Sequence, residues 1–348
     1  MAFDGITIAN VVKEMSDLLI GGRIYKIAQP EPDELLLTIR AQTGQYRLLI
    51  SAGASLPLIY LTEQNKQAPL TAPGFCMLLR KHLQNGRIVE ITQPGLERIV
   101  HIGVEHLNEM GDLCKKKLIV EIMGKHSNII FCDDKDMIID SIKHISGLVS
   151  SVREVLPGKP YFVADTTHKQ NPLETEAASF AETVQTAPMP VFKALYTSYT
   201  GISPIMAQEI CYRAGVDAEL PTAALAGGDV QKLFAEWNKV MQAVQAGDFA
   251  PGIAYEGEKP VEFAAFPLTI YKNVKNFDSM SNLLESYYAE KNAITRIRQK
   301  SVDLRKIVQT ALERNVKKYD LQLQQMKDTE KRETYRIYAP VKRGKFIR

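Results

Sequence analysis

Leu118-Ile-Val-Glu-Ile-Met-Gly-Lys-His-Ser-Asn-Ile-Ile-Phe131 is the stretch around which the chain is organised. Two apolar runs rich in β-branched residues, 118–122 and 129–131, flank a polar segment and predict a strand, a turn and a strand. The side chains of the turn can all donate hydrogen bonds: Lys125, His126, Ser127 and Asn128. Such a cluster suits a phosphate or the edge of a sugar, and an ordinary polar turn is the alternative.

Closely spaced apolar runs predict a sheet around this stretch. Strands are expected at 23–29, 34–40, 46–51, 58–61, 87–92, 98–104, 117–122, 128–132 and 137–142. Their connections are too short for helical crossovers, so the strands are expected to be antiparallel. Apolar residues recur at helical spacing in 7–20 and 73–83. We therefore predict an α+β domain over 1–170, ending in a Pro/Gly-rich segment at 155–161.

Residues 171–250 predict a helical domain that contains a helix-hairpin-helix. One helix is expected to end near Gly201, and Ser203 can cap the next, with Pro204 at its first position. In that motif the turn offers backbone N–H groups to a phosphate, which makes Gly201 and Ser203 candidate phosphate-binding residues. A helical hairpin that simply packs on its neighbour is the alternative. Residues 251–278 are expected to form a connecting insert with a strand pair at 261–266 and 268–272.

Residues 279–338 predict one long helix. Apolar residues recur there at three-, four- and seven-residue steps, which is typical of a coiled-coil arm. From Lys291 to Arg348 there are 17 Lys/Arg and 6 Asp/Glu, a net charge of +11, whereas the rest of the chain has a net charge of −8. The arm is therefore expected to contact a polyanion. Its candidate contacts are Arg296, Arg298, Lys300, Arg305 and Lys306.

A helix of this kind needs a partner, and the segment 339–348 offers none. We therefore expect the chain to be truncated after the first coiled-coil helix. The start, Met1-Ala-Phe-Asp-Gly5, shows no basic region followed by a long apolar run, so no secretory signal is expected. No apolar stretch approaches the ~20 residues of a membrane-spanning helix. The 4 cysteines are scattered without a C-x-x-C pair, which indicates reduced thiols in a cytoplasmic protein and no metal site.

No catalytic motif stands out in the sequence. Asp4 lies at the start of the first predicted helix, where capping is the simplest role for a carboxylate. Glu97 and Arg98 lie at the start of a predicted strand, so one of the two is expected to be exposed. An exposed arginine there could bind phosphate or stack on a base, and a solvated strand end is the alternative.

Five sequence motifs together resemble the NFACT family, over essentially the whole chain up to about Tyr338. The most specific is Glu121-Ile-Met-Gly-Lys-His-Ser-Asn128. The others are Phe3-Asp-Gly5, Gly21-Gly-Arg-Ile24 leading to Gln29-Pro30, Phe75-Cys-Met-Leu-Leu-Arg-Lys-His-Leu83 and Gln93-Pro-Gly-Leu-Glu-Arg-Ile-Val100.

The resemblance implies a fold and a function. The N-terminal domain is expected to resemble that of formamidopyrimidine-DNA glycosylase, followed by helix-hairpin-helix and coiled-coil parts. Members of the family work in ribosome-associated quality control. They bind the split large ribosomal subunit (rRNA) with its stalled peptidyl-tRNA and recruit charged tRNA, and bacterial members use alanyl-tRNA to direct alanine tailing. The chain is thus expected to be a cytoplasmic RNA-binding protein, not an enzyme, with no cofactor, no membrane and no obligatory small molecule.

The family's acidic residue in the first helix matches Asp4, and its Asp-Arg pair matches Glu97-Arg98, with Glu in place of Asp. The family loop often has Arg where Lys125 stands, so a bidentate phosphate contact is lost there. These residues, with His126, Ser127 and Asn128, are the candidate tRNA-binding residues. Ala2-Phe3 replaces the Pro-Glu pair of the glycosylase, so base excision is not expected. A DNA-glycosylase-like enzyme and a fibronectin-binding surface adhesin are the alternative functions.

Overall fold

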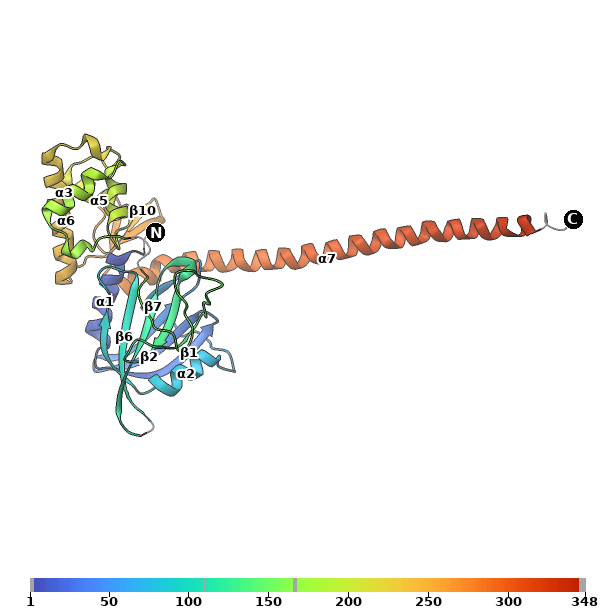
Figure 1. The fold of residues 1–348 in the computed structure, drawn as a ribbon, viewed down its shortest axis with the longest axis horizontal. Helices are drawn as coiled ribbons and strands as arrows, with labels where there is room; N and C mark the ends of the chain where they lie inside the picture. Colours follow the sequence, from blue (N-terminus) through green and yellow to red (C-terminus); the bar gives the residue numbers. More distant parts are fainter. Residues whose placement is uncertain (1–2, 109, 165–167, 344–348) are drawn as a thin grey trace. The chain divides into compact units, whose positions relative to one another are not determined.

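A computed structural model describes residues 3–108, 110–164 and 168–343 of the chain (Figure 1). The side chains of residues 290–300, 303 and 339–343 lie outside this description. The chain divides into two compact units, Met1–Tyr287 and Tyr288–Arg348, and each is described by itself below.

The first unit is built on one antiparallel sheet, which in the described part of the chain has nine strands in the order β4-β3-β2-β1-β5-β6-β7-β8-β9. The antiparallel pairing predicted from the short connections is therefore confirmed. Its strands are β1 (Arg23–Glu31), β2 (Glu34–Ala41), β3 (Gly44–Ser51), β4 (Leu58–Leu61), β5 (Arg87–Thr92), β6 (Ile99–Leu107), β7 (Leu113–Glu121), β8 (Asn128–Cys132) and β9 (Ile138–Ser141).

Two helices pack on this sheet, α1 (Gly5–Leu19) against β2, β4, β5 and β6, and α2 (Gly74–Leu83) against β1 and β6. The side of α1 that faces the core carries Ile8, Val11, Met15 and Leu19, all fully buried. These four residues recur at three- and four-residue steps, so the apolar spacing that predicted a helix also selects its buried face. The fold class, α+β with a mainly antiparallel N-terminal part, is confirmed.

A second layer is helical and consists of α3 (Ala177–Thr186), α4 (Val191–Ser198), α5 (Pro204–Ala214) and α6 (Gly227–Ala246). Its core contains Phe180, Tyr199 and Trp237, and the Tyr199 and Trp237 ring centroids lie 4.5 Å apart. Ile6 of α1 and Leu96, from the sheet part of the unit, belong to the same apolar cluster. The helical layer is therefore packed onto the N-terminal end of α1, as Figure 1 shows for α1, α5 and α6.

A small sheet follows the helical layer, with β10 (Gly252–Glu256) between β11 (Lys259–Ala264) and β12 (Val274–Asn276). The strand predicted at 261–266 overlaps β11, but the strand predicted at 268–272 is wrong, because that segment forms turns. The buried carboxylate of Glu209 causes the difference. It accepts hydrogen bonds from the backbone N–H groups of Thr269 (2.9 Å) and Ile270 (3.1 Å), so these groups do not pair with a strand.

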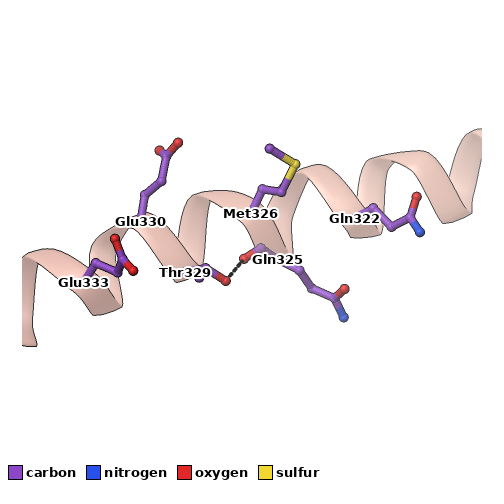
Figure 2. A pocket seen from close by; sticks show the side chains of 6 residues that line it. All are labelled: Gln322, Gln325, Met326, Thr329, Glu330 and Glu333. Carbon is purple, nitrogen blue, oxygen red and sulfur yellow. Dashed lines mark hydrogen bonds between the residues drawn. The ribbon is translucent and has the colours of Figure 1, made fainter.

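The last helix, α7 (Met280–Arg343), is 64 residues long and ends beyond the predicted boundary at 338. From Val302 to Tyr338 its described apolar residues are exposed, and one stripe of the helix carries Leu304, Val308, Leu312, Tyr319 and Met326. No described residue covers this stripe, so the predicted coiled-coil pairing stays a prediction. Figure 2 shows that Glu330 and Glu333 follow Met326 along the helix.

Candidate nucleic-acid interface

The first candidate residue, Asp4, caps α1. Its Oδ1 accepts a hydrogen bond from the backbone N–H of Thr7 at 2.8 Å, and its Oδ2 accepts one from the Ser203 hydroxyl at 2.5 Å. Burial raises the pKa of Asp4, although both hydrogen bonds act in the opposite direction. Asp4 is 6% exposed, so its carboxylate serves the fold and does not reach a ligand from this position. The capping role that we expected for Asp4 is confirmed.

The turn between α4 and α5 packs against the same helix end. Ser203 caps α5 by accepting from the backbone N–H of Met206 at 3.4 Å, as predicted. The N–H of Gly5 donates to Gly201 O at 3.0 Å. A Cβ at Gly5 or at Gly201 would lie 2.0 or 2.2 Å from Leu96 O, so the three backbone segments touch. Protein thus fills the turn that we predicted to hold a phosphate, and the Ser203 hydroxyl bonds to Asp4 instead.

This junction also holds the loop that carries Glu97 and Arg98. The side-chain N–H of Gln93 donates to Gly5 O and to Glu97 O, both at 2.8 Å. Glu97 and Arg98 form the turn before β6, not its first residues, and both are half-buried. The prediction that one of the two is exposed is therefore wrong, because the alternation of a strand has not yet begun at these positions.

Sequence reasoning missed a third charged residue at this loop, Lys169. Its ammonium donates to Tyr196 O at 2.8 Å. Burial lowers the pKa of Lys169, and the nearby charge of Arg98 lowers it further. No sequence pattern predicts that Lys169 lies near Arg98, because the two residues are 71 positions apart in the sequence and come together only through the packing of the fold.

The polar turn between β7 and β8 divides into an exposed half and a buried half. Lys125 and His126, in a short 3-10 turn, are exposed, whereas Ser127 and Asn128 are buried. The Ser127 hydroxyl accepts from the backbone N–H of Met123 at 2.8 Å. Only the exposed pair can touch a ligand. Of the four donor side chains predicted for the turn, two therefore lie at the surface and two belong to the buried base of the turn.

Asn128 and Lys143 form that base. The Asn128 side chain donates to Lys143 O at 2.9 Å and accepts from the Lys143 N–H at 3.1 Å. The Lys143 ammonium donates to Ser127 O at 3.0 Å and also to Ala52 O. Burial lowers the pKa of Lys143. These bonds fix the turn to two other parts of the unit.

A buried ion pair lies at the same end of the sheet. The Arg153 guanidinium donates to both carboxylate oxygens of Glu121, and the Tyr161 hydroxyl donates to Glu121 Oε1 at 3.0 Å. Burial raises the pKa of Tyr161, and the Glu121 charge adds to the effect. Because the Ile122 N–H donates to Arg98 O at 2.8 Å, Arg98 and the polar turn share this end of the sheet.

The candidate contacts of the basic arm lie on α7. Arg305 and Lys306 are exposed. Arg296, Arg298 and Lys300 fall in the helix, but their side chains lie outside the described residues. Among the described residues, no helix is long and apolar enough to cross a membrane. No group of three His, Cys, Asp or Glu side chains in the described part of the chain is placed to hold a metal ion.

Comparison with known proteins places this geometry in a family. The chain is 35% identical to the Rqc2 homolog RqcH of Bacillus subtilis, over 97% of this chain and 58% of that protein. It is 33% identical to the Rqc2 homolog RqcH of Streptococcus suis, over 97% of this chain and 57% of that protein. The chain thus spans little more than half the length of these curated relatives.

Solved structures agree with the sequence matches. The N-terminal part of a fibronectin/fibrinogen-binding protein from Streptococcus suis superposes with a TM-score of 0.69 at 31% identity, covering 83% of this chain and 99% of that one. The family described as NFACT N-terminal and middle domains matches residues 4–341. The chain therefore belongs to the NFACT family.

Proposed function

We propose that this chain is the RNA-binding part of a ribosome quality control factor. Its match to RqcH proteins over 97% of its length carries the proposal, together with a match to the ribosome quality control complex subunit 2 of Schizosaccharomyces pombe over 28% of the chain. In this role it binds the split large ribosomal subunit with its stalled peptidyl-tRNA and recruits charged tRNA, in particular alanyl-tRNA, for alanine tailing of the nascent chain.

The tRNA contact is proposed for the end of the sheet where Arg98, Lys125 and His126 lie. A guanidinium offers a planar fork to phosphate and can stack on a base, and an ammonium and an imidazole add further donors. Lys169 adds a further cation beside Arg98. Asp4, Ser127 and Asn128 are buried, and we propose that they position these groups.

The chemistry of peptide-bond formation is proposed to stay with the ribosome, so the chain itself is not an enzyme. It positions tRNA through its charged surfaces, and the exposed cations of α7, Arg305 and Lys306, are proposed to follow rRNA. Neither a DNA-glycosylase activity nor a fibronectin-binding role is favoured by a feature of the described residues.

The experiment compares tRNA recovery on large ribosomal subunits purified with the tagged protein. Arg98→Ala should reduce recovered tRNA more than tenfold, since a hydrogen bond to a charged group contributes about 1.5–3 kcal/mol. Lys239→Ala, an exposed cation on α6, is the control and should leave recovery unchanged. Normal tRNA recovery with folded Arg98→Ala would overturn the role of this residue. A wild-type protein that fails to purify with large subunits would overturn the function.

A further inference from the structure

A row of charged side chains crosses the sheet at the end opposite to Arg98. The register pairs Arg40 with Arg23, Arg23 with Arg87, Arg87 with Glu105 and Glu105 with Lys115. Directly paired residues of neighbouring strands point to the same face of a sheet. Four cations and one carboxylate therefore stand side by side across β2, β1, β5, β6 and β7, with strands about 4.8 Å apart. We call these five residues the arginine row.

The arginine row is only partly neutralised. Arg87 pairs with Glu105 at 2.9 Å, and Lys115 pairs with Glu90 at 2.8 Å. In the described part of the chain, Arg23 and Arg40 form no ion pair. Arg23 donates one bond to Asn85 O at 2.9 Å, and the Arg40 guanidinium lies 3.4 Å from the centre of the Tyr25 ring. Most of their donors face solvent, because both residues are exposed.

Like charges directly opposite each other on neighbouring strands destabilise a sheet. Arg23 has such a neighbour on both sides, Arg40 on β2 and Arg87 on β5. A glutamate at this position would instead have two opposite charges beside it. The arrangement is therefore unfavourable for the isolated fold and becomes favourable when an anion lies along the row. A surface that binds a polyanion typically carries such a loss of stability in the free protein, because its like charges repel one another until the ligand is bound.

A cleft of about 450 Å³ opens beside the row and shares Arg23, Arg87 and Glu105 with it. The rings of His82 and His106 also line this cleft, with centroids 6.2 Å apart. The Nε2 atom of His106 is buried and has no hydrogen-bond partner among the described residues. The cleft thus places two imidazole rings next to guanidinium groups.

We propose that the arginine row and this cleft bind a single-stranded RNA segment, with its phosphates on Arg23 and Arg40 and a base in the cleft. Proteins bind single strands in this way, with cations along the backbone and aromatic rings under the bases. The inference rests on the proposed function, to which it adds a second contact. Because Glu105 lies seven positions after Arg98 along the chain, the row crosses β6 about 24 Å from Arg98. Figure 1 shows α2 and the far end of β6 at this end of the sheet.

An acidic peptide is the competing ligand for a cationic row. A guanidinium fork fits phosphate and carboxylate oxygens equally well. RNA is favoured because rings line the cleft beside the row, and a base can stack on a ring whereas a peptide carboxylate needs no ring surface beside it. The two ligands are distinguished with a labelled 12-nucleotide RNA of mixed sequence and an oligoglutamate of equal charge. Tighter binding of the oligoglutamate, unaffected by competing RNA, would overturn the proposal.

The decisive variant is Arg23→Glu, with Arg23→Gln as a second variant that adds no new charge. The expected loss of affinity for the 12-nucleotide RNA is about fivefold per lost phosphate contact at 0.1 M salt, and the slope of log Kd against log salt should fall by about 0.7. Lys239→Glu, an exposed residue of α6, is the control for the change in net charge. Unchanged affinity and slope in both Arg23 variants would overturn the inference.

A structural role for Arg23 is separated by the melting temperature. If Arg23 serves RNA, Arg23→Glu should melt at the same temperature as the wild type or higher, because it relieves repulsion from Arg40 and Arg87. A lower melting temperature together with unchanged RNA affinity would show that Arg23 stabilises the fold only. The test of the proposed function is separate. Normal tRNA recovery with Arg98→Ala would overturn the role of Arg98, whereas a loss of 12-nucleotide RNA binding in Arg23→Glu would still support the arginine row.

Discussion

Replacement of Asp4 by alanine tests the junction on which the candidate site is built. Alanine removes the cap of α1, which contributes about 1 kcal/mol. It also leaves the buried Ser203 hydroxyl without its acceptor, which costs about 1–3 kcal/mol. We expect Asp4→Ala to lower the free energy of unfolding by about 2–4 kcal/mol. Asp4→Asn keeps an acceptor for the Thr7 N–H and should cost less than about 1 kcal/mol.

Urea unfolding followed by tryptophan fluorescence measures this loss well. The chain has 1 tryptophan, Trp237, which is buried in the helical layer that packs on α1. Ser203→Ala should also destabilise, and the double variant with Asp4→Ala should lose less than the sum of the two, because they break the same bond. A loss below about 1 kcal/mol for Asp4→Ala, or equal losses for the Ala and Asn variants, would refute the reasoning.

The pH dependence of the unfolding free energy tests the sign of the electrostatic contribution of Asp4. The folded pKa of Asp4 is raised above the usual value of 3.8 by burial, so the proton binds more tightly in the folded state. Its contribution to stability is therefore complete below pH 3.8 and is lost as the pH rises through the folded pKa. The difference in unfolding free energy between wild type and Asp4→Asn should shift in favour of the Asn variant as the pH rises. A difference that shifts the other way contradicts a raised pKa.

Two further results follow from the buried groups. Asn128→Ala should destabilise the chain by about 1–3 kcal/mol in urea unfolding, because the backbone of Lys143 loses an acceptor and a donor. Replacement of the exposed Lys125 by alanine should keep the wild-type urea midpoint and weaken RNA binding. A lower midpoint in Lys125→Ala would show that this side chain stabilises the fold. Burial raises the pKa of Cys132 to about 12, so this thiol should stay unreactive towards a disulfide reagent at pH 8 in the folded protein, while the half-buried Cys114 reacts; rapid modification of Cys132 before unfolding would contradict the packing.

Local sequence patterns predicted the sheet well because the property that they report is local. A run of β-branched residues such as 118–122 specifies a strand from its own side chains, and a short connection specifies an antiparallel neighbour. The same reasoning failed at 268–272, where the partner is a carboxylate on α5. Glu209 lies 60 positions before Thr269, and no local pattern announces that bond.

The sequence predicted which residues form the candidate site, but not which of them are exposed and which are buried. Ser127 and Asn128 have the same donors as Lys125 and His126, and only the position of Lys143 decides that the first two are buried. Asp4 and Ser203 are 199 positions apart, so each was predicted as a cap of its own helix. The bond that joins the two caps depends on how the helical layer packs, which the sequence pattern does not report.

The arginine row shows where such a limit lies. Each of its arginines is at the end of a strand that the sequence predicts, Arg23 at the start of 23–29, Arg40 at the end of 34–40 and Arg87 at the start of 87–92. The pairing of Arg23 with Arg40 follows from a hairpin between consecutive strands. The pairing of Arg23 with Arg87 does not follow from consecutive strands, because β2, β3, β4 and α2 lie between β1 and β5 in the sequence. The net charge of +3 does not reveal this local charge density, which arises from the strand order. A change of Arg23 alone should therefore weaken RNA binding even though the net charge of the chain changes little.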